Sequence, residues 1–140
     1  MTKQELDEVL EGLNLTRKRF CEKLGINYMT FNNNWGTKTP IPQYAISWLE
    51  LYKTAQIYEK ILEIKNIKIR ESKGSNFTRK DFDERLKELH LTRKNFSEMA
   101  GVRYANLSHW DCKYPTPLWV ENWLNAYDYA EKFKRLEIQL

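Results

Sequence analysis

The chain has little of what several classes of protein require. It contains two cysteines, too few for a disulfide framework, and no run of about 18 apolar residues that could span a membrane. The first ten residues, MTKQELDEVL, are polar and acidic, unlike a secretory signal peptide. We therefore expect a cytoplasmic protein.

Residue groups that carry catalysis are also scarce. The sequence offers no Ser/His/Asp set, no phosphate-binding glycine loop and no convincing pair of catalytic carboxylates, so we expect no enzyme and no cofactor. His109 and Cys112 are three residues apart, but a zinc site needs four protein ligands, or three and a water. We expect no metal, and no small-molecule ligand is evident.

What the sequence does have is an internal repeat. Between Thr2–Tyr28 and Thr78–Tyr104, 13 of 27 positions are identical at a constant offset of 76 residues. Such self-similarity indicates a duplicated unit. We expect a first unit at residues 1–70, a short linker at 71–76 and a second unit at 77–140.

Each copy begins with the pattern of a capped helix. Thr2 and Glu5 have capping-box spacing, which recurs at Thr78 and Asp81. The apolar residues that follow lie on one helical face: Leu6, Leu10 and Leu13 in the first copy, and Phe82, Leu86 and Leu89 in the second.

A helix, a turn and a second short helix come next in both copies. Thr16 or Thr92 can cap the first helix, and Gly25 or Gly101 can end it in a left-handed conformation. This order is typical of a helix-turn-helix unit. We expect these residues in the cores: Phe20, Cys21, Leu24, Phe31, Trp35 and Trp48 in the first copy, and Phe96, Leu107, Trp110 and Trp123 in the second.

The spacing resembles the Cro/phage-repressor (XRE-type) helix-turn-helix family. That pattern has a capping Ser or Thr, a Gly nine residues before a Trp, then a basic stretch and a Pro. The second copy keeps it from Gly101 to Trp110 and Pro115, whereas the first has one extra residue within Asn32–Asn34. The resemblance implies an all-α fold of tandem duplicated lambda-repressor-like helix-turn-helix units, each followed by a long C-terminal helix. It further implies a bacterial or phage-encoded transcriptional regulator that binds double-stranded DNA sequence-specifically as a single-chain pseudo-dimer.

The family holds the residues just after the turn against base edges in the major groove. Asparagine can pair with adenine, arginine with guanine, and alanine can touch a thymine methyl. The resemblance thus assigns base contacts to Asn27, Tyr28, Met29, Asn32 and Asn33 in the first copy, and to Arg103, Tyr104, Ala105, Ser108 and His109 in the second. The alternative is that these are ordinary exposed helix residues.

The family also places the start of the first motif helix against a phosphate. Basic side chains in a first turn oppose the helix dipole, so a phosphate that neutralises them would explain their presence in both copies. The alternative is a solvated basic face. The implied phosphate contacts are Thr16, Arg17, Lys18 and Lys38, and Thr92, Arg93, Lys94 and Lys113.

A long helix is predicted after each proline pair, the first from Pro42 to about Arg70. It has two apolar stripes, one of Leu51, Ala55, Tyr58 and Leu62 and one of Ile57, Ile61 and Ile64. So wide an apolar surface packs against something, either within the chain or in a homodimer.

The net charge of +4 is compatible with DNA but decides little. The chief rival is a protein-interaction module on the same fold, antitoxin-like or a phage-encoded inhibitor. A basic stripe joining Arg17, Lys18, Arg93 and Lys94 would favour DNA. A large exposed apolar patch would favour a protein partner.

Overall fold

The computed structural model describes residues 1–139, which form eight α-helices, one short 3₁₀ helix and no strand. This confirms the all-α expectation. The first half contains α1 (Lys3–Gly12), α2 (Arg17–Leu24), α3 (Tyr28–Asn34) and α4 (Gln43–Ile64). After the 3₁₀ helix η1 (Gly74–Asn76), the second half contains α5 (Arg79–Glu88), α6 (Arg93–Ala100), α7 (Tyr104–Leu107) and α8 (Leu118–Gln139). Among the described residues, no helix has an apolar stretch long enough to cross a bilayer.

The predicted caps form at the start of both halves. The Thr2 and Thr78 hydroxyls accept hydrogen bonds from the backbone N–H groups of Glu5 (3.1 Å) and Asp81 (3.2 Å). The two carboxylates accept in return from the threonine N–H groups. Each capping box satisfies two backbone donors that a helix start would otherwise leave unpaired.

The two turn glycines are required for two separate reasons. Gly25 and Gly101 have φ values of 86° and 72°, a left-handed conformation that disfavours side chains. Both also meet the other half of the chain. A Cβ on Gly25 would lie 3.0 Å from that of Leu118, and a Cβ on Gly101 would lie 2.5 Å from that of Gln43.

Aromatic side chains fill both cores, as predicted. Phe20 contacts Phe31 and Trp48, with ring centroids 5.7 Å apart in each pair, and in the second half Phe82 contacts Phe96 at 5.0 Å. Every residue expected in a core is buried, Cys21 included. One buried ion pair joins α5 to α8, with Arg85 Nη2 2.9 Å from Asp128 Oδ2.

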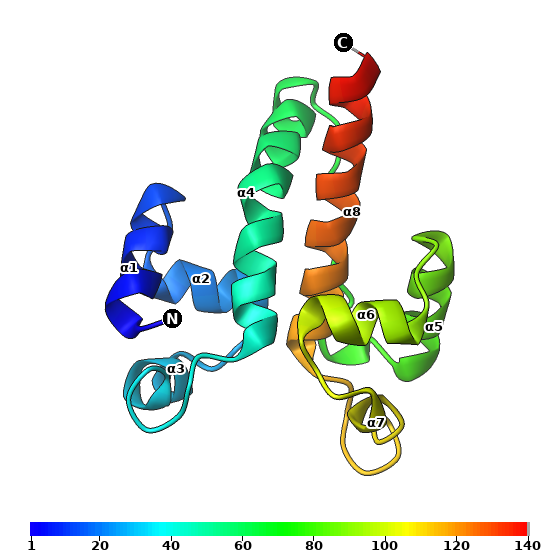
Figure 1. Cartoon of the computed structure of the whole chain (residues 1–140). Coiled ribbons are helices and arrows are strands. Elements are labelled where there is room, and N and C mark those ends of the chain that lie inside the picture. Colours follow the sequence, from blue (N-terminus) through cyan, green and yellow to red (C-terminus); the bar gives the residue numbers. More distant parts are fainter. Residues whose placement is uncertain (140) are drawn as a thin grey trace.

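The two long helices α4 and α8 lie side by side and run in the same direction (Figure 1). Tyr44 at the start of α4 stacks on Trp119 of α8 with ring centroids 4.1 Å apart, and Tyr58 contacts Tyr129 further along. Ala55 and Leu62 of the first predicted stripe are buried, and Leu51 and Tyr58 are half-buried. That stripe therefore packs within the chain.

The two halves exchange equivalent contacts across this helix pair. Helix α4 packs on α6, and α8 packs on α2. Ser47 donates to the carbonyl of Met99 (2.8 Å), and Asn122 donates to the carbonyl of Leu24 (3.0 Å). Ser47 and Asn122 occupy matching positions of α4 and α8, and their acceptors are one residue out of register in the repeat, so the contact has approximately the reciprocal form of a two-fold interface.

The first long helix ends at Ile64, so the expectation that it continues to about Arg70 is wrong. Asn66 adopts a left-handed φ of 58°, and the N–H of Ile67 bonds back to the carbonyl of Leu62, a common way to end a helix. Residues 65–73, here called the return segment, then run back along α8. The N–H of Arg70 donates a hydrogen bond to the Tyr129 hydroxyl (3.1 Å). Because α4 ends at Ile64, the connection between the two halves begins at residue 65, before the linker expected at residues 71–76.

The end of the return segment is anchored by one buried carboxylate. Glu121 of α8 accepts hydrogen bonds from the Ser72 hydroxyl (2.7 Å) and from the backbone N–H groups of Lys73 and Gly74. A carboxylate with several donors is a strong anchor, because each of these hydrogen bonds is assisted by its charge. The connection between the halves is therefore fixed in place.

Candidate nucleic-acid interface

The short helices α3 and α7 lie at the same end of the molecule, below the starts of α4 and α8 in Figure 1. Each begins three residues after its turn glycine. They hold the residues to which the sequence assigned base contacts. The pairing of the two halves through α4 and α8 thus brings both candidate surfaces to one end.

Helix α3 exposes three of the five candidates of the first copy. Tyr28, Met29 and Asn33 are open to solvent. Asn27 is exposed too, but its side-chain oxygen caps the helix by accepting from the N–H of Thr30 (3.0 Å). Asn32 is half-buried, and its side-chain oxygen accepts from Arg17 Nη1 (2.9 Å), which leaves only its amide N–H groups for a ligand.

The extra residue of the first copy lengthens α3. This helix continues to Asn34, whereas α7 ends at Leu107. After the helices the two copies match again, since Trp35 pairs with Thr39 as Trp110 pairs with Tyr114. The insertion is thus absorbed within α3 and does not disturb the loop.

Helix α7 and its flanks expose Arg103, Tyr104, Ala105 and Ser108. The Arg103 guanidinium makes no ion pair or side-chain hydrogen bond with the described part of the chain. His109 is half-buried, with Nδ1 3.2 Å from the Tyr114 hydroxyl. Arg103 is therefore the best-placed charged group on this helix for a base or phosphate.

The arginines at the starts of α2 and α6 have carboxylate partners. Arg17 binds Asp7 through Nε (2.8 Å) and Nη2 (2.6 Å), and Arg93 binds Asp83 with the same two distances. The hydrogen bond from Arg17 lowers the pKa of Asp7, and the hydrogen bond to Asp83 raises the pKa of Arg93. A phosphate is thus not needed to explain these cations, because the preceding helix supplies a negative charge.

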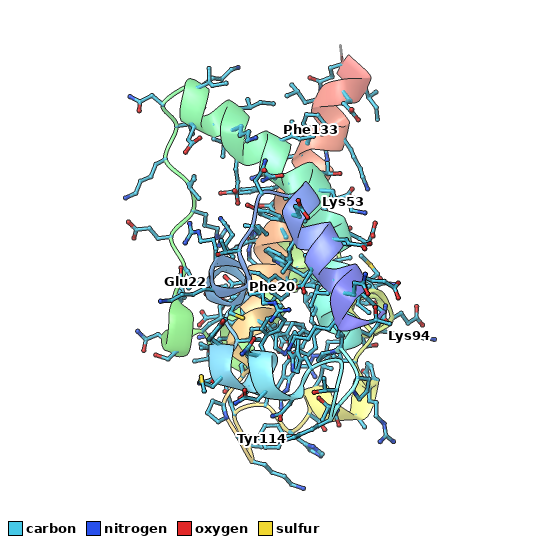
Figure 2. All side chains as sticks on the ribbon, turned by 90° about the vertical axis from the view of Figure 1, so that its left-hand side faces the viewer. Phe20, Glu22, Lys53, Lys94, Tyr114 and Phe133 are labelled. Carbon is cyan, nitrogen blue, oxygen red and sulfur yellow. The ribbon has the colours of Figure 1, made fainter. Side chains whose placement is uncertain are left out.

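The remaining phosphate candidates differ in what they offer. Lys18 and Lys94 are exposed in the first turns of α2 and α6 (Lys94 is labelled in Figure 2), and Lys38 and Lys113 are exposed in the loops after α3 and α7. The hydroxyls of Thr16 and Thr92 cap their helices by accepting from backbone N–H groups. The basic stripe expected through Arg17, Lys18, Arg93 and Lys94 has less net positive charge than the sequence suggested. Arg17 and Arg93 are already paired with carboxylates.

Carboxylates are nearly absent from the α3 and α7 segments. No Asp or Glu occurs between Glu22 and Glu50, and only Asp111 occurs between Glu98 and Glu121. Asp111 accepts from the backbone N–H groups of Arg79 and Thr116, and the bond from Arg79 is the main cause of its lowered pKa. The α3 and α7 segments therefore carry a positive or neutral charge. The sequence alone already shows this shortage of Asp and Glu.

Two residues that the sequence reasoning missed support α3 and α7. Lys3 Nζ donates to the carbonyls of Phe31 (3.2 Å) and Asn32 (2.6 Å), and Arg79 Nη1 donates to the carbonyl of Ser108 (3.2 Å). Cations at helix C-termini stabilise unpaired carbonyls. Lys3 and Arg79 occupy the same position of the repeat. This recurrence of a basic residue is the only feature of the sequence that could have identified them.

Within residues 1–139, no group of three or more His, Cys, Asp and Glu side chains is arranged to hold a metal ion. The chain matches no family model, and no curated protein or solved structure is significantly similar to it.

Proposed function

We propose that the chain is a sequence-specific double-stranded DNA-binding protein, a transcriptional regulator built from two tandem lambda-repressor-like helix-turn-helix units that act as a single-chain pseudo-dimer. The observation that carries this proposal is the position of α3 and α7 at one end of the molecule (Figure 1). There they expose hydrogen-bonding side chains in segments with almost no carboxylates. Such a surface suits a polyanion with readable base edges.

The pairing of the halves bears on the form of the DNA site. Helices α4 and α8 run in parallel, and each contacts the other half's first motif helix in the same way. A two-fold relation of this kind favours half-sites in inverted order rather than a direct repeat. Because Asn27 and Met29 stand where the second copy has Arg103 and Ala105, we expect the two half-sites to differ in sequence.

The test is a salt titration of binding to labelled duplex DNA selected from a random pool. If each unit neutralises roughly three phosphates, log K should fall with log salt at a slope of about −5. Lys113→Ala should weaken binding on all sequences and make the slope shallower by about one unit. Arg103→Ala should cost about 1–3 kcal/mol and relax preference at one base pair.

Lys60→Ala is the matched control, because Lys60 is an exposed lysine on the distal part of α4. It should bind duplex as the parent does. Affinity that does not depend on salt, or Arg103→Ala and Lys113→Ala proteins that bind like the parent, would remove DNA as the ligand.

A protein-interaction module is the second candidate, and one observation favours it. Isoleucines are exposed at the end of the α4–α8 pair opposite to α3 and α7, with Ile64 and Ile138 each 85% exposed. Ile57 of the second predicted stripe is exposed as well. Exposed apolar side chains that gather in one region are typical of an interface, and a second copy of this chain is one occupant to test.

Light scattering after size exclusion separates these cases for the parent and for Ile64→Asp. A dimer that dissociates in the variant would support a homodimer through the long helices, and its combined DNA site would again be palindromic. If both the parent and Ile64→Asp are monomeric, a second copy of the chain is excluded, and the partner of this surface would have to be a different protein.

A further inference from the structure

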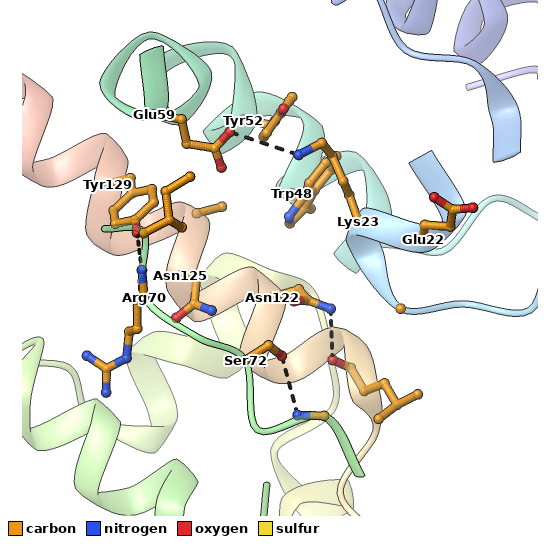
Figure 3. Close-up of a pocket in the computed structure, with 15 residues that line it drawn as sticks. Glu22, Lys23, Trp48, Tyr52, Glu59, Arg70, Ser72, Asn122, Asn125 and Tyr129 are labelled. Atoms are coloured by element: carbon orange, nitrogen blue, oxygen red, sulfur yellow. Dashed lines mark hydrogen bonds and ion pairs between the residues drawn. The ribbon is translucent and has the colours of Figure 1, made fainter. Parts of the chain in front are cut away.

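A cavity of about 390 Å³ lies between the two halves, under the return segment (Figure 3). Helices α2 and α4 of the first half, α8 of the second half and residues 69–74 contribute to its walls. Its volume is in the range of sites that bind small molecules, roughly 300–1,000 Å³. The return segment passes along α8 only once, so the cavity belongs to one side of the pseudo-symmetric pair.

A comparison of two equivalent tryptophans identifies an unpaired donor in this cavity. Trp123 of α8 donates its indole N–H to the Ser47 hydroxyl (2.9 Å). Trp48, at the matching position of α4, is 2% exposed and lines the cavity. Its N–H makes no hydrogen bond within the described part of the chain and opens onto the cavity, since Arg85 Nε is the side-chain atom that is both buried and unpaired there. In Figure 3 the indole nitrogen of Trp48 lies on the side of the ring that faces Asn122 and Asn125. An indole nitrogen can only donate, so it requires an acceptor.

The reason for the difference lies at the position that matches Ser47. Asn122 occupies it in α8, and its amide nitrogen donates to the carbonyls of Leu24 (3.0 Å) and Leu118 (3.3 Å). Within residues 1–139, no group donates a hydrogen bond to the side-chain oxygen of Asn122. Trp48 therefore presents an unused donor to the cavity, and Asn122 an unused acceptor.

The charged groups of the cavity oppose one another. Lys23 lies 3.9 Å from the Glu59 carboxylate and above the ring of Tyr52, with Nζ 5.4 Å from the centroid. Glu22 and Arg70 add one charge of each sign. Because the four charges cancel, the cavity does not favour an ion of either sign.

The ring of Trp48 packs against two other aromatic rings. Trp48 stacks on Tyr52 with centroids 4.6 Å apart, and Phe20 packs against its ring at 5.7 Å. A ligand therefore meets the N–H edge of Trp48. Ile69 of the return segment and Ala126 of α8 provide apolar surface for the ligand's own ring.

We propose that this cavity binds a small, uncharged molecule of the size of a nucleoside, with a planar ring that contains a lactam. A lactam has a carbonyl and an N–H side by side, which match the donor of Trp48 and the acceptor of Asn122. The bound molecule would contact both halves and the return segment together. This assignment is independent of DNA binding.

The experiment is isothermal titration of the full chain with four nucleosides. Uridine and guanosine contain a lactam in the base, and in 3-methyluridine and 1-methylguanosine a methyl group replaces the hydrogen of the lactam N–H. We expect saturable binding of uridine or guanosine, and affinity at least about tenfold lower for the two methylated nucleosides, because the side-chain oxygen of Asn122 would then lose its donor.

Two tryptophan variants form a matched pair. Trp48→Phe keeps the aromatic ring and removes the N–H, so it should weaken nucleoside binding by about tenfold or more. Trp123→Phe removes an N–H that is bonded to Ser47, and it should bind as the parent does. Ile69→Trp, which fills the cavity from a position that is 43% exposed, should abolish binding without loss of a core residue.

The proposal is overturned if none of the four nucleosides gives saturable heat at millimolar concentration. It is also overturned if Trp48→Phe binds like the parent, or if Trp123→Phe loses as much affinity as Trp48→Phe. Equal binding of all four nucleosides would exclude the lactam as the recognised group.

Discussion

Replacement of Gly101 by alanine tests the close contact between the two halves. Gly101 has a φ of 72°, and a Cβ there would lie 2.5 Å from that of Gln43 on the facing helix α4. An atom so close to the Cβ of another residue cannot be avoided by a change of rotamer. Gly101→Ala should therefore be destabilised both by backbone strain and by steric overlap.

The magnitude follows from these two terms. An alanine in the left-handed region costs about 1–2 kcal/mol, and overpacking costs about 1–3 kcal/mol. The lower conformational entropy of the unfolded alanine chain offsets about 0.4–1 kcal/mol. The free energy of unfolding should fall by about 3 kcal/mol, which for a chain of this length lowers Tm by about 10 °C.

Urea denaturation of three glycine variants separates the terms. Gly74 has a positive φ of 57° with nothing within 4 Å of an added Cβ, so Gly74→Ala should show the strain term alone. Gly12 lies in α1 with nothing within 4 Å, and Gly12→Ala should be neutral or stabilising by up to about 1 kcal/mol. If Gly101→Ala and Gly74→Ala lose equal stability, the argument that α4 presses on the α6 turn is refuted.

Three further outcomes are expected. Asp128→Ala leaves the buried Arg85 with the exposed Glu88 carboxylate as its remaining ion-pair partner among the described residues, and it should lower the free energy of unfolding by about 3 kcal/mol in urea, whereas a loss below about 1 kcal/mol would show that Glu88 alone balances the arginine. The hydrogen bond from Lys73 and that from a backbone N–H lower the pKa of Asp81 from 3.8 to about 2, so its stabilising contribution is present above pH 4 and lost as the pH falls toward 2. The urea midpoint of Asp81→Asn should thus change less over that range than that of the parent; parallel curves would contradict this. Burial raises the pKa of Cys21 to about 11, so a thiol reagent should label exposed Cys112 quickly and Cys21 only on unfolding, and rapid labelling of two thiols would contradict the packing.

Local features of this fold were predictable because their partners are near in sequence. Thr2 caps a helix through Glu5, three residues away, and Gly25 ends a helix by its own backbone freedom. The burial of Phe20 and Trp48 follows from helical spacing and from the area that aromatic rings remove from water. These expectations needed only the repeat and the periodicity of the helix.

The candidate interface was predictable in its residues but not in its partners. The sequence placed Arg17 at the start of a helix, where its charge opposes the helix dipole. That Asp7 neutralises it depends on how α1 packs against α2, and no pattern in the sequence records that packing. The same holds for Asn32, whose oxygen is taken by Arg17 only because α3 lies across the start of α2.

The sequence by itself determined the helices, their caps, the duplicated pattern and the residues of each core, because interactions within a few residues along the chain set them. Only the tertiary structure decided that α4 packs in parallel on α8 and that a cavity remains beside Trp48. Contacts such as Tyr44 on Trp119 join residues far apart in the chain. Their geometry depends on the simultaneous fit of both halves, and an apolar stripe indicates only that a helix is covered, not by which neighbour.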